Sequence, residues 1–348
     1  MSDEVHRRIN HQLDKAERSD SCLVPVAEKD RKALLDRGLE LIQPLRGMFA
    51  RRSTWRRLTP PQRVMQLMRG IASRHPTWNF CGTSAAVAYG LPVTWRYLTH
   101  VEVATRSSGR SVPGIRMRRL GERRAIVRDG LRLTTFWRTV FDCLVTLDFP
   151  DALAIADAAL RRTGTTAREL VERLRTTYRG HRGLRRALEV AALADGRAES
   201  GGESIARAAM HELGFAAPRI QVWIEDPLEP GKWFRVDFAW LTRDGQLIIG
   251  EMDGRGKSML PELTEGRETA RVLQDERLRE SHLTVFRPAI IRFGYDNLLD
   301  REAFEHKLDS YGVPRNDSEL QELPELMSLQ DAILLLGWCD VEISLEAA

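Results

Sequence analysis

The sequence predicts an α/β protein with more than one domain. Its 348 residues are more than a typical single domain contains. Segments with helical spacing of apolar residues are interspersed with short segments in which apolar and polar residues alternate, as strands do. The charge balance also changes sign along the chain: residues 1–200 carry 37 Lys and Arg against 21 Asp and Glu, whereas residues 201–348 carry 16 against 28. We therefore expect a basic N-terminal half and a separate acidic C-terminal half.

Residues 1–50 are expected to form a small helical or winged-helix-like segment. The pattern predicts helices over residues 4–18 and 27–37, the second ending at Gly38. Short strands are predicted over 39–42 and 48–50, with a turn over 44–47 between them. A helix followed by a short hairpin is typical of the end of a winged helix.

Residues 51–195 are expected to form a basic α/β domain that ends in helices. Thr59-Pro60-Pro61 favours a helix start, because proline is tolerated in the first turn. Alternation predicts strands over 100–105 and 115–119. Thr166 and Glu169 have the spacing of a capping box. The small, polar stretch at 195–202 coincides with the change of charge sign, and we place the domain boundary there.

Arginine in residues 51–150 points to nucleic acid. This block has 18 basic residues, all of them arginine, and only 5 acidic residues. The guanidinium group donates paired hydrogen bonds that match phosphate, so we expect DNA binding. A genome rich in G and C would explain the ratio of arginine to lysine but not the shortage of acidic residues. The candidate contacts are Arg116, Arg118, Arg119, Arg123 and Arg124.

Several classes of protein are not expected. No apolar run is long enough to span a bilayer, and the first residues lack the apolar core of a signal peptide. The four cysteines are widely separated and include no CxxC pair, which argues against a disulfide framework or a thiolate zinc site. We expect a cytoplasmic protein.

The segment 203–257 carries the candidate chemistry. Two strands are predicted over 232–241 and 246–252, and the turn Arg243-Asp244-Gly245 favours a register in which Asp237 lies opposite Glu251. Two carboxylates at this spacing can share Mg²⁺ or Mn²⁺, which prefer oxygen ligands. Alternatively, both acids lie at the solvent end of the sheet, or Arg235 or Arg255 pairs with them.

This segment resembles the very-short-patch-repair-like domain of the PD-(D/E)xK nuclease superfamily, over about residues 200–300. The matching stretches are Glu203-Ser204, Arg235-Val236-Asp237-Phe238-Ala239-Trp240, Glu251-Met252-Asp253-Gly254-Arg255-Gly256-Lys257, Gln274-Asp275-Glu276-Arg277-Leu278-Arg279 and Ile290-Ile291-Arg292-Phe293. The resemblance implies a restriction-endonuclease-like α/β fold over residues 196–300.

The resemblance also implies roles for single residues. Asp237 and Glu251 match the acidic metal ligands, and Glu203 matches the helix carboxylate that supports the metal or its water. Lys257 falls where related domains carry a histidine or lysine. Asp253 stands where the superfamily has its lysine, which leaves charge stabilisation to Lys257 or Arg255.

An upstream region resembles AbiEi-type antitoxin proteins, which place a winged helix before a basic α/β domain. The matching residues are Ser84-Ala85-Ala86, Gly90-Leu91-Pro92, Gly130, Thr134-Thr135, Arg138-Thr139-Val140 and Asp142. This resemblance implies DNA binding and a protein partner such as a cognate toxin.

Three functions therefore remain open for the whole chain. The first is a magnesium-dependent DNA endonuclease or phosphodiesterase. The second is a non-catalytic DNA-binding transcriptional regulator of antitoxin type that retains a nuclease-like fold. The third is a toxin-neutralising interaction protein. Residues 301–348 are expected to form an acidic helical extension, in which Ser328 caps a helix over 329–336.

Overall fold

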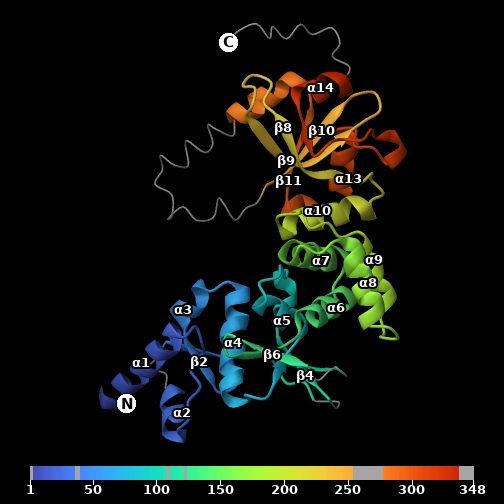
Figure 1. Cartoon of the computed structure of the whole chain (residues 1–348). Helices are drawn as coiled ribbons and strands as arrows, with labels where there is room; N and C mark the ends of the chain where they lie inside the picture. Colours follow the sequence, from blue (N-terminus) through green and yellow to red (C-terminus); the bar gives the residue numbers. More distant parts are fainter. Residues whose placement is uncertain (1–2, 36–39, 107–109, 121–123, 254–276, 337–348) are drawn as a thin grey trace. The chain divides into compact units, whose positions relative to one another are not determined.

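A computed structural model shows a mixed α/β protein that divides into two compact units (Figure 1). Unit 1 comprises Met1–Ala194 and unit 2 comprises Asp195–Ala348. The structure describes residues 3–35, 40–106, 110–120, 124–253 and 277–336. Within these residues, no helix combines the length and the apolar composition needed to cross a membrane.

Unit 1 begins with two helices and a hairpin, in the order that the sequence predicts. The helices are α1 (Asp3–Arg18) and α2 (Glu28–Leu34), and the hairpin is formed by β1 (Leu41–Leu45) and β2 (Met48–Arg51). Ile9 and Leu13 of α1 are fully buried against Leu34 and Phe49. A helix with this apolar stripe is stable only when a neighbour covers the stripe.

The turn of this hairpin is shorter than the turn predicted over residues 44–47. Gly47 has a φ of +73°, which permits a tight reversal just before β2. Strand β1 therefore continues through Pro44, where the pairing register shifts between Ile42 and Leu45. Proline is tolerated at such an irregularity because it has no N–H group to donate.

The centre of unit 1 is a five-stranded mixed sheet with the order β5-β4-β3-β7-β6. Its strands are β3 (Asn79–Phe80), β4 (Val101–Thr105), β5 (Ile115–Arg119), β6 (Ala125–Arg128) and β7 (Leu131–Thr134). The strand order puts β5 and β6 at opposite edges of the sheet. Helices α3 (Arg52–Arg57), α4 (Pro60–Arg74) and α5 (Gly82–Ala88) come before and between these strands.

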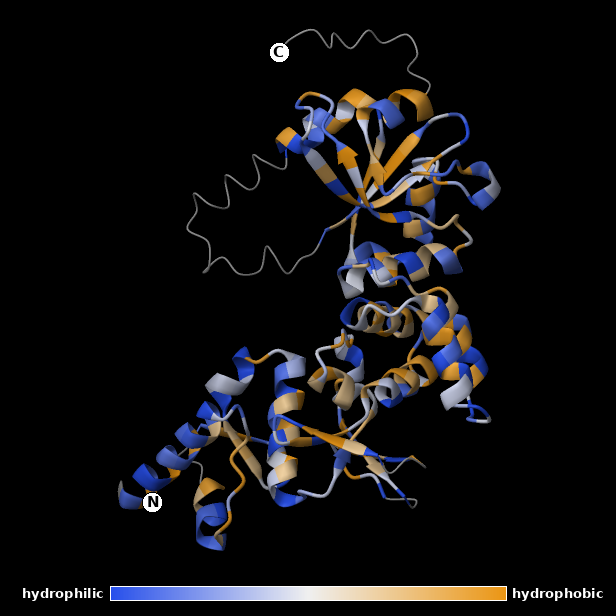
Figure 2. Ribbon diagram, viewed as in Figure 1, coloured by the Kyte–Doolittle hydropathy of each residue, from blue (hydrophilic) through white to orange (hydrophobic). Residues whose placement is uncertain are grey.

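Four helices complete unit 1. They are α6 (Phe136–Thr146), α7 (Phe149–Thr163), α8 (Ala167–Thr177) and α9 (Leu184–Ala192). Helix α7 ends at Gly164, which has a φ of +67°, and α8 begins with the capping box of Thr166 and Glu169. Apolar and polar residues alternate along α8 and α9 (Figure 2), which matches the burial of one face of each helix.

Unit 2 is built on a second five-stranded sheet with the order β11-β10-β9-β8-β12. Helix α10 (Gly201–Glu212) precedes the antiparallel strands β8 (Arg219–Glu225), β9 (Trp233–Leu241) and β10 (Leu247–Asp253). Residues 277–283 are helical, and β11 (Ala289–Gly294) then runs parallel to β10. Short helix α12 (Tyr295–Leu299), helix α13 (Arg301–Ser310), β12 (Leu326–Met327) and α14 (Leu329–Leu335) follow.

Both faces of this sheet are covered, and residues after 300 help to cover them. Phe304 and Leu308 of α13 are fully buried with Phe238 and Phe293 on one face. On the other face, Met327 and Ala332 pack with Leu247 and Ile249. Residues 301–348 are predicted to form a separate extension, whereas the apolar side chains of its described residues are buried against the sheet and belong to the same core.

Candidate functional site

The three candidate carboxylates stand on three different elements of unit 2. Glu203 lies in the first turn of α10, where the hydroxyl of Ser200 accepts its backbone N–H at 3.1 Å. Asp237 lies in β9 and Glu251 in β10. The register of these strands is the predicted one, because Phe238 lies opposite Gly250. The neighbouring residue Asp237 also contacts β10, because its Oδ2 accepts the backbone N–H of Met252 at 2.9 Å.

Gln221 joins two of these acids. Its Nε2 donates to Glu203 Oε2 at 2.9 Å and lies 3.4 Å from Asp237 Oδ1. Gln221 has a φ of +55° within β8, a conformation that costs a non-glycine residue energy and that is often found at functional sites. Its Oε1 is buried and has no hydrogen-bond partner among the described residues. Sequence reasoning did not find Gln221, because nothing in the chain order marks a residue that bridges a helix and a strand.

The pKa of Glu251 is raised to about 7. Burial raises this pKa most, and the nearby charge of Asp237 raises it further, while Arg279 lowers it. Arg279 Nη2 donates to Glu251 Oε1 at 2.5 Å and to the backbone carbonyl of Arg235 at 2.7 Å. Glu251 therefore exchanges a proton near neutral pH, which is the range in which a general acid or base works.

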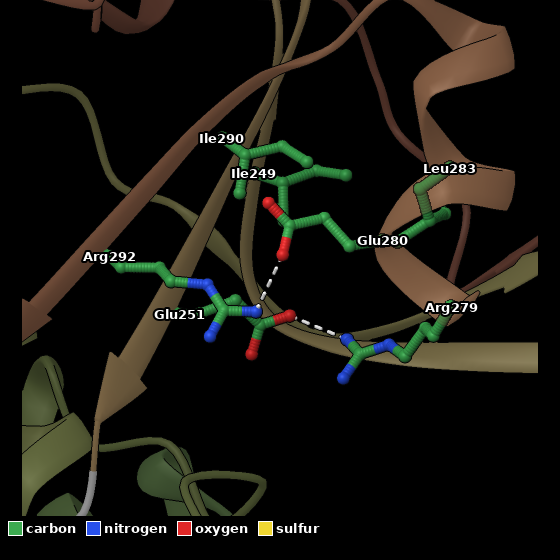
Figure 3. Close-up of a pocket in the computed structure, with 7 residues that line it drawn as sticks. All are labelled: Ile249, Glu251, Arg279, Glu280, Leu283, Ile290 and Arg292. Atoms are coloured by element: carbon green, nitrogen blue, oxygen red, sulfur yellow. Dashed lines mark hydrogen bonds and ion pairs between the residues drawn. The ribbon is translucent and has the colours of Figure 1, made fainter. Parts of the chain in front are cut away.

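Glu251 also lines a small pocket between β10, β11 and the helix at 277–283 (Figure 3). Besides Glu251, the pocket is lined by Ile249, Arg279, Glu280, Leu283, Ile290 and Arg292. Arg292 Nη2 donates to Glu280 Oε2 at 3.0 Å. Two arginines and two glutamates thus face one another here, so the charges of the pocket are balanced by its own side chains.

The three carboxylates are linked, but their oxygens do not surround one point as the ligands of a single ion do. Carboxylate oxygens have the right chemistry for Mg²⁺. Yet among the described acidic, histidine and cysteine side chains, the three whose ligand atoms all lie within 4.8 Å of one another are Asp226, Glu229 and His282. The charged group in contact with Glu251 is the guanidinium of Arg279 and not a second carboxylate. In this arrangement the predicted ligands do not fit a metal ion held by all three.

The Asp226, Glu229 and His282 cluster lies elsewhere in unit 2. Asp226 is buried, and its carboxylate lies 2.8 Å from His282 Nδ1. The same carboxylate accepts the backbone N–H groups of Leu228 and Glu229, so it organises the turn between β8 and β9. These contacts give the cluster a structural role.

The remaining predicted residues of unit 2 have varied places. Asp253 is exposed at the end of β10, and Lys257 and Arg255 lie outside the described residues. Arg235 makes a paired contact with Glu199, at 2.6 and 2.8 Å, and not with the candidate acids. The arginine that pairs with Glu251 is Arg279, which lies in one of the stretches that resemble the nuclease domain and for which the resemblance implies no role.

The candidate arginines of unit 1 do not form one group. Arg116 and Arg119 are exposed on edge strand β5, and Arg124 is exposed just before β6 at the other edge. Arg118 is largely buried and lies 3.4 Å from Glu102, whose pKa is about 2. Burial would raise that pKa, but His100, Arg118 and the Thr83 N–H outweigh it. Arg118 is thus engaged within the fold, and Arg123 lies outside the described residues.

Five of the residues that carry the antitoxin-type resemblance, Ser84, Thr134, Arg138, Thr139 and Asp142, are buried and hydrogen-bonded within the fold. The Ser84 hydroxyl accepts the backbone N–H of Glu102 at 2.8 Å, and the hydroxyls of Thr134 and Thr139 lie 2.8 Å apart. Arg138 Nε donates to Asp142 Oδ1 at 3.0 Å, and both side chains are almost inaccessible. These residues hold α5 and α6 to the sheet and do not form an open site.

Comparisons with known proteins assign no activity. No family model matches the chain, and no solved structure matches it. The chain is similar to two uncharacterized proteins, MT2308 and Rv2248, from two strains of Mycobacterium tuberculosis. Each is 39% identical over 137 residues, which is 37% of this chain and 49% of the relative. The chain thus spans about half the length of the curated relatives it matches.

Proposed function

We propose that this protein binds DNA and that unit 2 is a divalent-ion-dependent phosphodiesterase domain of the very-short-patch-repair-like type. The observation that carries the proposal is that Gln221 joins Glu203 to Asp237, while the charge of Asp237 raises the pKa of Glu251. A scaffold gains nothing from placing two carboxylates so that one raises the pKa of the other, whereas perturbed acids gather at sites of chemistry.

The side chains have distinct tasks in this proposal. Asp237 is held by the Met252 N–H and by Gln221, so its carboxylate is pre-oriented. Glu251, whose pKa is about 7 without an ion, loses its proton to solvent when a cation binds, because a nearby positive charge favours the carboxylate. When bound, Mg²⁺ or Mn²⁺ supplies the charge that stabilises a phosphoryl group. Asp237 and Glu251 are the residues that would hold the ion, with Glu203 supporting them.

Incubation of the full chain with supercoiled plasmid tests this function. We expect nicking with Mg²⁺ or Mn²⁺ and none with EDTA, because the carboxylates alone cannot offset the charge that develops on phosphate. Gel separation of supercoiled and open forms measures it. Intact plasmid under all three conditions would rule out the nuclease.

A second candidate function is a non-catalytic DNA-binding regulator of antitoxin type, with a winged-helix-like segment at residues 1–50 and a toxin as protein partner. The ion pair of Arg279 and Glu251 favours it, because the site is already neutralised by its own arginine. In this case the nuclease-like fold is retained for stability or for contact with the partner, and DNA binding persists without cleavage.

Both functions require a phosphate-contacting surface, and exposed Arg116 and Arg119 are our candidates for it. We expect the double change Arg116→Ala/Arg119→Ala to weaken duplex DNA binding and to reduce the slope of log affinity against log salt by about 2, because each phosphate contact releases counterions. Fluorescence anisotropy across a salt series measures this slope. Arg168→Ala/Arg179→Ala, which removes two exposed arginines from another part of unit 1, is the matched control. An unchanged slope in the first variant would move the contact surface away from β5.

A further inference from the structure

The positively charged group beside Glu251 is the side chain of Arg279. Arg279 donates through one Nη2 atom to Glu251 and to the backbone carbonyl of Arg235, at 2.5 and 2.7 Å. The two side chains are only 27% and 18% exposed. A charge-assisted hydrogen bond that is largely shielded from solvent is stronger than an ion pair exposed on the surface. Figure 3 shows Arg279 and Glu251 pointing toward each other.

The other acids of the site are held by neutral donors. Asp237 accepts from the Met252 N–H and Glu203 accepts from the Glu199 N–H and from Gln221. A neutral amide does not repel an arriving cation. Arg279 does, because it carries a full positive charge and already uses an oxygen that a divalent ion needs.

The other described arginines nearby donate to other carboxylates, although the charge of Arg292 also lowers the pKa of Glu251. Arg235 is paired with Glu199, and Arg292 donates to Glu280. Arg279 is therefore the arginine whose position decides whether Glu251 is open to a metal ion. When an ion binds Glu251, Arg279 still has a hydrogen-bond acceptor, the backbone carbonyl of Arg235.

We propose that Arg279 sets the affinity of the acid site for divalent cations by competing with them for Glu251, so that an ion binds there only after the guanidinium has left this carboxylate. The proposal rests on the proposed function, because it concerns the same site. It explains how one site has the acids of a nuclease and yet is neutralised in the structure.

Calorimetric titration of the full chain with Mn²⁺ tests the competition. We expect Arg279→Gln to bind Mn²⁺ at least about tenfold more tightly than the wild type, because the competing charge is lost while a donor to the Arg235 carbonyl is kept. Arg277→Gln is the matched control, since Arg277 is an exposed arginine on the same helix. We expect it to bind Mn²⁺ as the wild type does. Affinity in Arg279→Gln equal to or weaker than in the wild type would overturn the proposal.

Thermal unfolding verifies that each variant is folded. If Arg279→Gln does not fold, Arg279→Met replaces it, because methionine keeps an unbranched side chain but removes the positive charge. We then expect tighter Mn²⁺ binding than in the wild type, and equal or weaker binding would again overturn the proposal.

Plasmid nicking separates this inference from the proposed function. Tighter Mn²⁺ binding by Arg279→Gln without nicking by any variant supports the competition and overturns the nuclease. Nicking by the wild type together with unchanged Mn²⁺ affinity in Arg279→Gln overturns the competition and supports the nuclease.

Discussion

Replacing Asp237 with Asn is expected to reduce any ion-dependent nicking of plasmid by on the order of 1000-fold or more. When catalytic residues act together, the loss of one costs nearly as much rate as the loss of all of them. Asparagine has nearly the shape of aspartate but no charge, so it binds Mg²⁺ or Mn²⁺ poorly. Its amide also cannot accept equally well from both donors that now hold Asp237, the Met252 N–H and Gln221. The initial rate of loss of supercoiled plasmid measures the effect.

The matched control is Asp253→Asn. Asp253 lies two residues beyond Glu251 and is exposed at the end of β10, so this variant has the same change of charge nearby without touching the linked acids. We expect it to nick plasmid at a rate close to that of the wild type, and both variants to keep their affinity for DNA. Undiminished nicking by Asp237→Asn would show that Asp237 takes no part in the cleavage.

Replacing Arg138 with Ala is expected to destabilise unit 1 by about 3–5 kcal/mol, the usual cost of leaving a buried charge without its partner. Arg138 and Asp142 are 6% and 4% exposed, and the guanidinium lies over the stacked rings of Phe141 and Tyr178. Burial already raises the pKa of Asp142, and Arg138 opposes this rise. Urea denaturation at pH 7 measures the loss in free energy of unfolding.

The pH dependence of this loss identifies its cause. Without Arg138 the pKa of Asp142 rises further, so the folded variant holds a proton that the unfolded chain releases. A raised carboxyl pKa in the folded state means that stability is retained at low pH and falls as the pH increases toward that pKa. We therefore expect the difference between variant and wild type to shrink as the pH is lowered below 7.

An exposed pair supplies the control. Arg185 and Glu189 of α9 are also four residues apart, but their side chains are 95% and 61% exposed. We expect Arg185→Ala to change the free energy of unfolding by a small fraction of the Arg138→Ala effect, because water screens this pair. Similar losses in both variants would show that burial of the Arg138 pair does not matter.

Local signals accounted for much of the fold. The capping box of Thr166 and Glu169 starts α8 as predicted, and Ser328 caps α14 through Asp331. The register of β9 and β10 followed from a three-residue turn, since turn length and alternation leave one pairing with a buried face. Such features depend on residues a few positions apart, so the sequence specifies them directly.

The partners of the predicted site residues did not follow from the sequence. Arg118 and Arg116 have the same spacing pattern, yet Arg118 is largely buried beside Glu102 and Arg116 is exposed. Gln221 and Arg279 reach the acids from β8 and from the helix at 277–283. Contacts between residues 15 to 30 positions apart depend on how elements pack, and no local pattern encodes them.

By itself, the sequence determined the α/β class, the helices with clear caps, the excess of arginine before residue 200 and the strand pair that carries Asp237 and Glu251. The tertiary structure decided which charges are free and which are paired, with Arg279 against Glu251 as the case that matters most. The reason is physical: propensity and periodicity act along a few residues of chain, whereas the free energy of a charge depends on its burial and on whichever side chain the fold brings within about 3 Å of it.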